Sequence, residues 1–251
     1  MAGHWDASTD EIDIGTWDVG TIQAFTMGAW IKFTSTKVFD ARILSKASST
    51  AGAQHDWMFG TISNTSFRVR FKAGGTTDTF LPTATTISNG VWYSVIVQYD
   101  GTNVQMWVNN VSQFDTAHSV GGDMDATSKQ IYIGNNAGGS KGPDTSDIHS
   151  VFVCSTLLTA ADRLAIFHGY TIDQLINDAH IEANYKMAEA SYLGHDYGPH
   201  RRSGTPSGVT WVASNTVIQP FKPFPFAGMA VAGGAPPAST PHNLLLLGVG
   251  A

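Results

Sequence analysis

The sequence predicts an all-β protein in which two antiparallel sheets pack face to face as a β-sandwich. The main observation is the segment 91–111, where two alternating runs of apolar residues flank a short polar turn. The composition agrees, because 26 glycines and only 14% charged residues suit many short strands joined by tight turns. At 251 residues and 42% hydrophobic content the chain can bury one sizeable core, and a sandwich of this length is normally a single domain.

The hairpin predicted over 91–111 fixes which side chains face the core. The turn residues 100–103, DGTN, tolerate turn dihedrals and set the register of the two strands. The pairs expected on one face are Tyr99 with Val104, Val97 with Met106, and Val95 with Val108. All six side chains are apolar, so this face is predicted to point inward, and a one-residue slip would mix it with the polar face.

The same hairpin resembles the "WYHVAVTYDGTNVRLYVNG" segment of the laminin-G-like, concanavalin A-like jelly rolls, also called pentraxin-like lectin domains. Further matches follow in the family's order at residues 25–32 (FTMGAWIK), 43–46 (ILSK), 56–60, 67–71, 131–134 (IYIG) and 148–161 (IHSVFVCSTLLTAA). The resemblance covers roughly residues 3–212 and implies a jelly roll, but it specifies almost nothing about a ligand.

Two short helices and one late strand are expected after the main sandwich. Thr159 can cap a helix over 160–168, and Thr171 can cap a second over 172–177, and both are expected to cover a sheet edge. Alternation over 181–187 predicts a strand. From there to Val212 the sequence resembles a segment that the family normally carries before its first strand, which implies that the carboxyl half closes the jelly roll.

A sugar-binding site would need aromatic platforms and polar groups on a sheet face or at the loop rim. The candidate ligand-binding residues are Trp30, Trp57 and Trp107. The alternative is that these rings serve packing, because large aromatic side chains in a two-layer sandwich are more often buried in the core or under a loop.

Calcium is the candidate cofactor, because the resembling family often holds this ion through loop carboxylates and carbonyls. The segment 121–127, GGDMDAT, offers Asp123 and Asp125, and a second loop offers Asp147. Where the family often has acidic residues, this chain has His149 and Ser150. The alternative is that the aspartates are solvated turn residues.

No catalytic residue is expected. Glu11 and Asp13 lie in EIDI, which resembles the signature of retaining laminarinase-type glycosidases, but Gly15 or Thr16 stands where the second acid belongs. Retaining glycosidases need two carboxylates about 5 Å apart, so the sequence predicts a protein that is not an enzyme.

Charge and cysteine content limit the partners and the location. The net charge of −6 and the absence of a basic run exclude a nucleic-acid surface, and no apolar stretch reaches the length of a membrane span. Cys154 is the only cysteine, and the first 15 residues resemble no secretory signal, so folding in a host cytoplasm is expected. A lectin-like fold made inside a cell suggests a tailed-phage virion protein, with a stand-alone carbohydrate-binding adhesion module and a glycoside hydrolase as alternatives.

The composition changes after Asp196, beyond which no acidic residue occurs and eight of the ten prolines lie. We therefore expect a jelly-roll domain over 1–213 and an extended assembly arm over 214–251, which contacts virion proteins or copies of the chain. The expected anchors of this arm are Phe221, Phe224, Phe226, Leu244, Leu245, Leu246 and Leu247.

Overall fold

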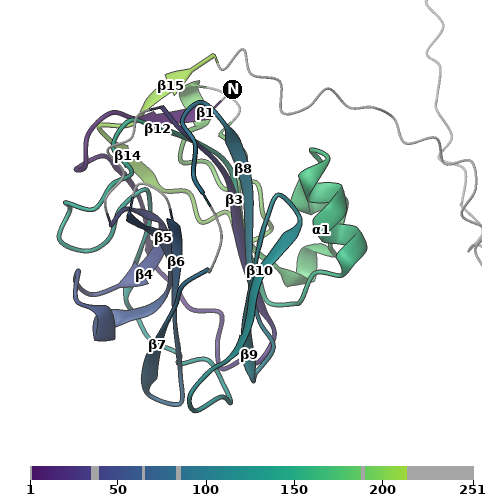
Figure 1. Ribbon diagram of the computed structural model, residues 1–251. Helices are drawn as coiled ribbons and strands as arrows, with labels where there is room; N and C mark the ends of the chain where they lie inside the picture. Colours follow the sequence, from purple (N-terminus) through teal and green to yellow (C-terminus); the bar gives the residue numbers. More distant parts are fainter. Residues whose placement is uncertain (1, 35–39, 64–65, 83–85, 188–189, 214–251) are drawn as a thin grey trace, which may run out of the picture. The chain divides into compact units, whose positions relative to one another are not determined.

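The protein is a two-sheet antiparallel β-sandwich, as the sequence predicts. The computed structural model describes residues 2–34, 40–63, 66–82, 86–187 and 190–213. Figure 1 shows the two layers, with helix α1 (Ala160–Phe167) against the outer side of one of them. The expected assembly arm, with its anchors at Phe221, Phe224, Phe226 and Leu244 to Leu247, lies outside the described residues.

The larger sheet, called sheet A, has the strand order β10-β9-β8-β3-β12-β1-β15, and β13 also pairs with β12. Its strands are β1 (Ala2–Trp5), β3 (Phe25–Phe33), β8 (Trp92–Tyr99), β9 (Asn103–Val108), β10 (Val111–Ala117), β12 (Ser146–Cys154), β13 (Ile181–Tyr185) and β15 (Thr210–Val212).

The second sheet, called sheet B, has the strand order β14-β2-β11-β4-β5-β6-β7. Its strands are β2 (Glu11–Thr16), β4 (Arg42–Ala47), β5 (His55–Ser63), β6 (Ser66–Ala73), β7 (Thr76–Phe80), β11 (Gln130–Ile133) and β14 (Thr205–Ser207). Short 3-10 turns occur at η1 (Gly52–Gln54), η2 (Ile172–Gln174), η3 (Asp178–His180) and η4 (Ala190–Tyr192).

The central hairpin has the predicted register. Tyr99 pairs with Val104, Val97 with Met106, and Val95 with Val108. All six side chains belong to the main core between the sheets, where Val97 and Met106 have no exposed surface. The Asp100 carboxylate closes the turn, because it accepts hydrogen bonds from the backbone N–H groups of Thr102 at 2.9 Å and Asn103 at 2.7 Å.

The carboxyl end of the described chain closes both sheets, as the resemblance implies. β15 pairs with β1 and thereby extends sheet A, while β14 pairs with β2 at the edge of sheet B. Both strands are only three residues long, and each pairs through its backbone with one of the first two strands of the chain. The two ends of the jelly roll are therefore joined by hydrogen bonding.

Helix α1 begins as predicted, but its position and the second helix differ from expectation. Thr159 and Asp162 form a reciprocal capping box. The helix covers the outer face of sheet A rather than an edge, because Ile166 packs with Ile96 and Phe152 of that face. The expected helix over 172–177 is only the turn η2, since the Asn177 side chain instead caps the next turn, η3.

Candidate functional site

The three tryptophans proposed from the sequence lie in packing positions. Trp57 lies between the sheets with 1% of its surface exposed, and its ring centroid is 5.5 Å from that of Phe25. Trp30, on the outer face of sheet A, is 5% exposed and stacks on Phe167 of α1 with 6.3 Å between ring centroids.

Trp107 also lies on the outer face of sheet A, where it packs against the cluster under α1. The Arg163 guanidinium covers its ring at 3.9 Å from the centroid, a cation–π arrangement that occupies the face a sugar would use. The tryptophans thus lie in two separate layers and form no shared platform. Trp57 therefore lies in the core, and Trp30 and Trp107 pack under a helix rather than under a loop. Their role in sugar binding stays a prediction.

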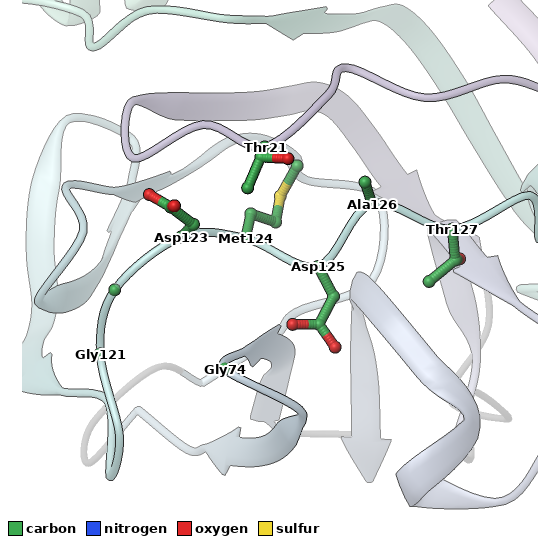
Figure 2. Close-up of a pocket in the computed structure, with 9 residues that line it drawn as sticks. Thr21, Gly74, Gly121, Asp123, Met124, Asp125, Ala126 and Thr127 are labelled. Carbon is green, nitrogen blue, oxygen red and sulfur yellow. The ribbon is translucent and has the colours of Figure 1, made fainter.

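A polar hollow of about 470 Å³ lies where three loops meet at one end of the sandwich (Figure 2). Thr21 comes from the β2–β3 loop and Gly74 from the β6–β7 turn, while residues 121–127 of the β10–β11 loop form its longest wall. Gly74, Gly121 and Gly122 contribute backbone without side chains to this lining. The hollow therefore offers carboxylates, hydroxyls and backbone polar groups together.

The β10–β11 loop is held in place by its neighbours. Gly121 and Gly122 adopt positive φ angles of 70° and 89°, which glycine accepts without strain. The Gly122 carbonyl accepts a hydrogen bond from the Tyr99 hydroxyl at 2.6 Å, and the Gly122 N–H donates to Gly101 of the hairpin turn at 2.7 Å. Met124 is 1% exposed in the main core. These contacts fix the wall of the hollow.

The two carboxylates of this wall have different surroundings. Asp123 is exposed, and its Oδ1 accepts a hydrogen bond from the Gln23 side-chain amide at 2.9 Å. Asp125 forms an ion pair with Lys72 at 3.0 Å and accepts a hydrogen bond from the Gly75 N–H at 3.0 Å. Burial would raise the pKa of Asp125, but the hydrogen bonds from Gly75 and Lys72 outweigh it and lower that pKa. Figure 2 shows the two carboxylates on opposite sides of the loop backbone.

The third residue proposed for calcium, Asp147, lies elsewhere. It is in β12, is 3% exposed, and its carboxylate pairs with Lys32 at 2.6 Å and with His4 at 2.6 Å. Lys32 and His4 each bind one carboxylate oxygen of Asp147, which therefore serves as a structural residue of sheet A, away from Asp123 and Asp125. Within the described ranges, no three His, Cys, Asp or Glu side chains are grouped to hold a metal ion. A calcium ion at Asp123 and Asp125 stays a prediction.

Glu11 and Asp13 lie on β2, next to the edge strand β14. Asp13 accepts hydrogen bonds from the Gly15 N–H at 2.8 Å and from the Gln130 side chain. Burial, followed by the nearby charge of Asp13, raises the pKa of Glu11. Asp13 therefore acts as a local turn and cross-strand acceptor.

A group of basic residues on sheet B was not among the sites predicted from the sequence. Arg68, Arg70 and Lys72 alternate along β6, and Arg42 begins β4. The period-2 spacing of basic residues in SFRVRFKA was the available signal, since alternation places them on one face. That these residues lie beside Arg42 follows only from the pairing of β4 with β5 and of β5 with β6.

The fold and the hollow define a lectin-like β-sandwich. The chain belongs to the concanavalin A-like lectin/glucanases superfamily, because the Laminin_G_3 family model matches residues 6–162, more than half of the chain. No curated protein sequence matches it.

Among solved structures, the chain is similar to a protein from Bacteroides ovatus that is provisionally described as carbohydrate-binding. The identity is 20% and the TM-score 0.61, and the match covers 84% of this chain and 59% of that one. A heptameric SAP-like pentraxin from Limulus polyphemus matches with 13% identity and a TM-score of 0.51, over 68% of this chain and 82% of the pentraxin. The chain thus spans less than two thirds of the Bacteroides protein, and these likenesses show the fold. In the part of the chain that is described, no helix is both long and apolar enough to cross a membrane.

Proposed function

We propose that the chain is a non-enzymatic accessory protein of a tailed-phage particle, and that its lectin-like sandwich binds a host-surface glycan at the loop hollow. The observation that carries the proposal is the hollow itself, where carboxylate, hydroxyl and backbone groups converge at one end of the fold. Sugar hydroxyls both donate and accept hydrogen bonds, so a site with both kinds of partner suits them.

Asp123 is the residue that we expect to contact the glycan first. It is exposed, it lies on the wall of the hollow, and its carboxylate accepts a hydrogen bond from Gln23 alone among the described residues. Asp125 is held by Lys72 and Gly75, so it orients the loop from the other side. A carboxylate that accepts two sugar hydroxyls makes charge-assisted hydrogen bonds.

The glycan test is an array screen of the full chain, repeated with EDTA so that a calcium requirement is measured directly. For any glycan bound, Asp123→Asn should weaken affinity by at least about tenfold, because a hydrogen bond to a charged group is worth roughly 1.5–3 kcal/mol. Asp115→Asn is the matched control, since Asp115 is an exposed aspartate of β10 outside the hollow. Equal affinity of Asp123→Asn and the unaltered chain would place glycan binding elsewhere.

The absence of hydrolysis is part of the proposal. Asp13 is engaged by Gly15 and Gln130, and the position of the second acid of a retaining pair holds Gly15 or Thr16. We expect no release of reducing sugar from β-glucans. Release that disappears in Glu11→Gln would show a glycosidase instead.

The particle role is supported by the sequence. Cys154 is buried and the chain has no second cysteine, so the sandwich needs no disulfide and can fold in a reducing host cytoplasm. The acid-free, proline-rich segment 214–251 fits an arm that docks on virion proteins or on other copies of the chain.

The particle test is mass spectrometry of gradient-purified virions from the virus that encodes the chain. Its peptides should band with the major capsid protein at a fixed ratio. Glycan binding without any peptide in the virions would favour the alternative, a stand-alone carbohydrate-binding adhesion module.

A further inference from the structure

A second polar site lies on sheet B, away from the hollow. It is called the arginine cluster and consists of Arg42, Arg68, Arg70, Lys141 and Asp40. Arg42 and Arg68 both pair with Gly60 of β5, from the two strands that flank it. A Cβ at this glycine would lie 1.9 Å from the Ala41 carbonyl oxygen, so the position accepts no larger residue.

One carboxylate serves three of the four cations. Asp40 pairs with Arg42 at 2.7 Å, with Lys141 at 2.9 Å, and with Arg68. Burial would raise the pKa of Asp40, but hydrogen bonds from Arg42 and Lys141 and the charges of both arginines hold that pKa well below its ordinary value. Asp40 is therefore fully ionised and already shared.

Arg68 and Arg70 have guanidinium N–H groups without a hydrogen-bond partner among the described residues. Arg68 is 5% exposed, and its Nε is buried without a hydrogen-bond partner. Arg70 has two such atoms, Nε and Nη1, and among the described residues it forms no salt bridge. The turn η1 covers it, because a Cβ added at Gly52 would lie 3.5 Å from the guanidinium carbon. Buried N–H donors without partners are costly, especially on a charged group.

Among the described residues that contact the cluster, Asp40 supplies the one negative charge. His55 has no exposed surface, its Nδ1 lies 2.9 Å from the Ala51 carbonyl oxygen, and its Nε2 is 3.4 Å from Arg42 Nε. This arrangement requires the neutral ring, and burial with the charges of Arg42 and Arg70 lowers its pKa to about 4. Burial and the charges of Arg68 and Arg42 also lower the pKa of Arg70, to about 10. The cluster thus carries four cations against one carboxylate.

The geometry points to an oxyanion site, in which Arg68 and Arg70 bind one carboxylate or sulfate group. Guanidinium groups match such anions with paired N–H donors, and Arg70 is half-buried and has no salt bridge among the described residues. Solvent reaches the cluster, since the side chains of Asp40 and Lys141 are 34% and 31% exposed. The ligand class is therefore an acidic group, either as a free ion or as part of an acidic sugar, which separates this site from the hollow, where the charged groups are the carboxylates of Asp123 and Asp125.

The test is calorimetric titration of the full chain at low ionic strength with sodium sulfate, D-glucuronate and neutral D-glucose. We expect saturable binding of sulfate or glucuronate, and no heat of binding with glucose. Which of the two anions binds more tightly tells whether a free ion or a charged sugar is preferred. Arg70→Gln should weaken anion binding at least about tenfold, and Arg70→Lys should weaken it less, because lysine keeps the charge but not the planar donors.

Arg201→Gln is the matched control, since Arg201 is exposed and its loss changes the net charge equally. Without ligand, Arg70→Gln should keep or raise Tm, because it removes an unpaired buried cation. The site would be refuted if the binding heat with sulfate did not saturate and was equal in Arg70→Gln and the unaltered chain. It would also be refuted if glucose bound as tightly as glucuronate. A third contrary result would be a Tm drop of more than about 3 °C in Arg70→Gln without ligand. None of them bears on the hollow, which is tested through Asp123.

Discussion

The covered parts of the two outer faces are built from opposite chemistry. On sheet A, the part under α1 and η2 is apolar and buries the cluster of Ile96, Phe152, Cys154, Leu158, Ile166, Ile172 and Ile181. On sheet B, the outer side carries Arg42, Arg68 and Arg70, and the cover is the short turn η1 rather than an apolar helix. One face is closed by hydrophobic burial, and the other keeps charged groups with unused hydrogen-bond donors.

The difference shows where binding chemistry can lie. Aromatic rings on the face of sheet A contribute most when they are buried, so Trp30 and Trp107 stabilise the helix instead of forming a platform. On sheet B, Arg70 forms no salt bridge with the described residues, which favours a role in recognition. Substitutions on the two faces should therefore have different effects on stability and on binding.

Val97→Asp should have the largest effect on stability, because it disrupts the hydrophobic core between the two sheets. Val97 is fully buried opposite Met106, and an unpaired charge there should cost at least about 4 kcal/mol of the free energy of unfolding. Circular dichroism should show loss of the cooperative thermal transition. Ser112→Asp, at an exposed position of β10, is the control and should keep the wild-type Tm. A normal transition in Val97→Asp would mean that the inner and outer faces of the hairpin are reversed.

Trp30→Ala should destabilise the chain by about 3–5 kcal/mol, because it leaves a cavity between sheet A and Phe167. Glycan and anion binding should not change in the fraction that remains folded, measured below the new Tm. Tyr192→Ala, which removes a 46% exposed ring, should cost less than about 1 kcal/mol. If Trp30→Ala kept its stability and lost glycan binding, sheet A would be the binding face and the comparison would be inverted.

Mild acid should weaken the fold, and His55 of sheet B should contribute to this loss together with His149 of sheet A, whose pKa is also lowered by burial. The folded pKa of His55 is about 4, below its ordinary value of 6.5, so the unfolded chain takes up a proton that the folded chain does not. The free energy of unfolding is therefore highest above about pH 6.5. It falls as the pH drops toward 4, by on the order of 2 kcal/mol. Thermal unfolding between pH 7 and 4 measures this loss.

His55→Gln should make that pH dependence shallower, while His180→Gln, at an exposed position, should leave it as it is. An unchanged slope in His55→Gln would show that the ring is protonated in the folded state, against the neutral ring inferred beside Arg42.

Truncation after Val212 should change stability least. The strands β14 and β15 stay in place, so the Tm should shift by less than about 1 °C, as for surface changes. The truncated chain should no longer oligomerise or join virions, as measured by light scattering and particle analysis. Unfolding on truncation would place residues 213–251 in the domain core, and normal assembly would refute the arm.

Local sequence patterns determined much of the fold. Alternation and the DGTN turn fixed the register of β8 and β9, and Thr159 with Asp162 fixed the start of α1. The basic alternation in β6 was equally visible. Such patterns suffice because they depend on residues close in sequence, through side-chain direction and backbone hydrogen bonding.

The tertiary structure alone decided what covers each face and which polar groups meet. Trp30 is buried because α1, more than 100 residues later, lies over it, and Asp147 is an ion pair because β1 and β3 bring His4 and Lys32 beside β12. Arg42 meets Arg68 only because β4, β5 and β6 are adjacent around Gly60. A periodic pattern says which side chains share a face, but burial and charge pairing depend on contacts between distant segments. For that reason the sequence predicted the sandwich, and only the packing showed which of its faces is covered by a helix and which carries the arginines.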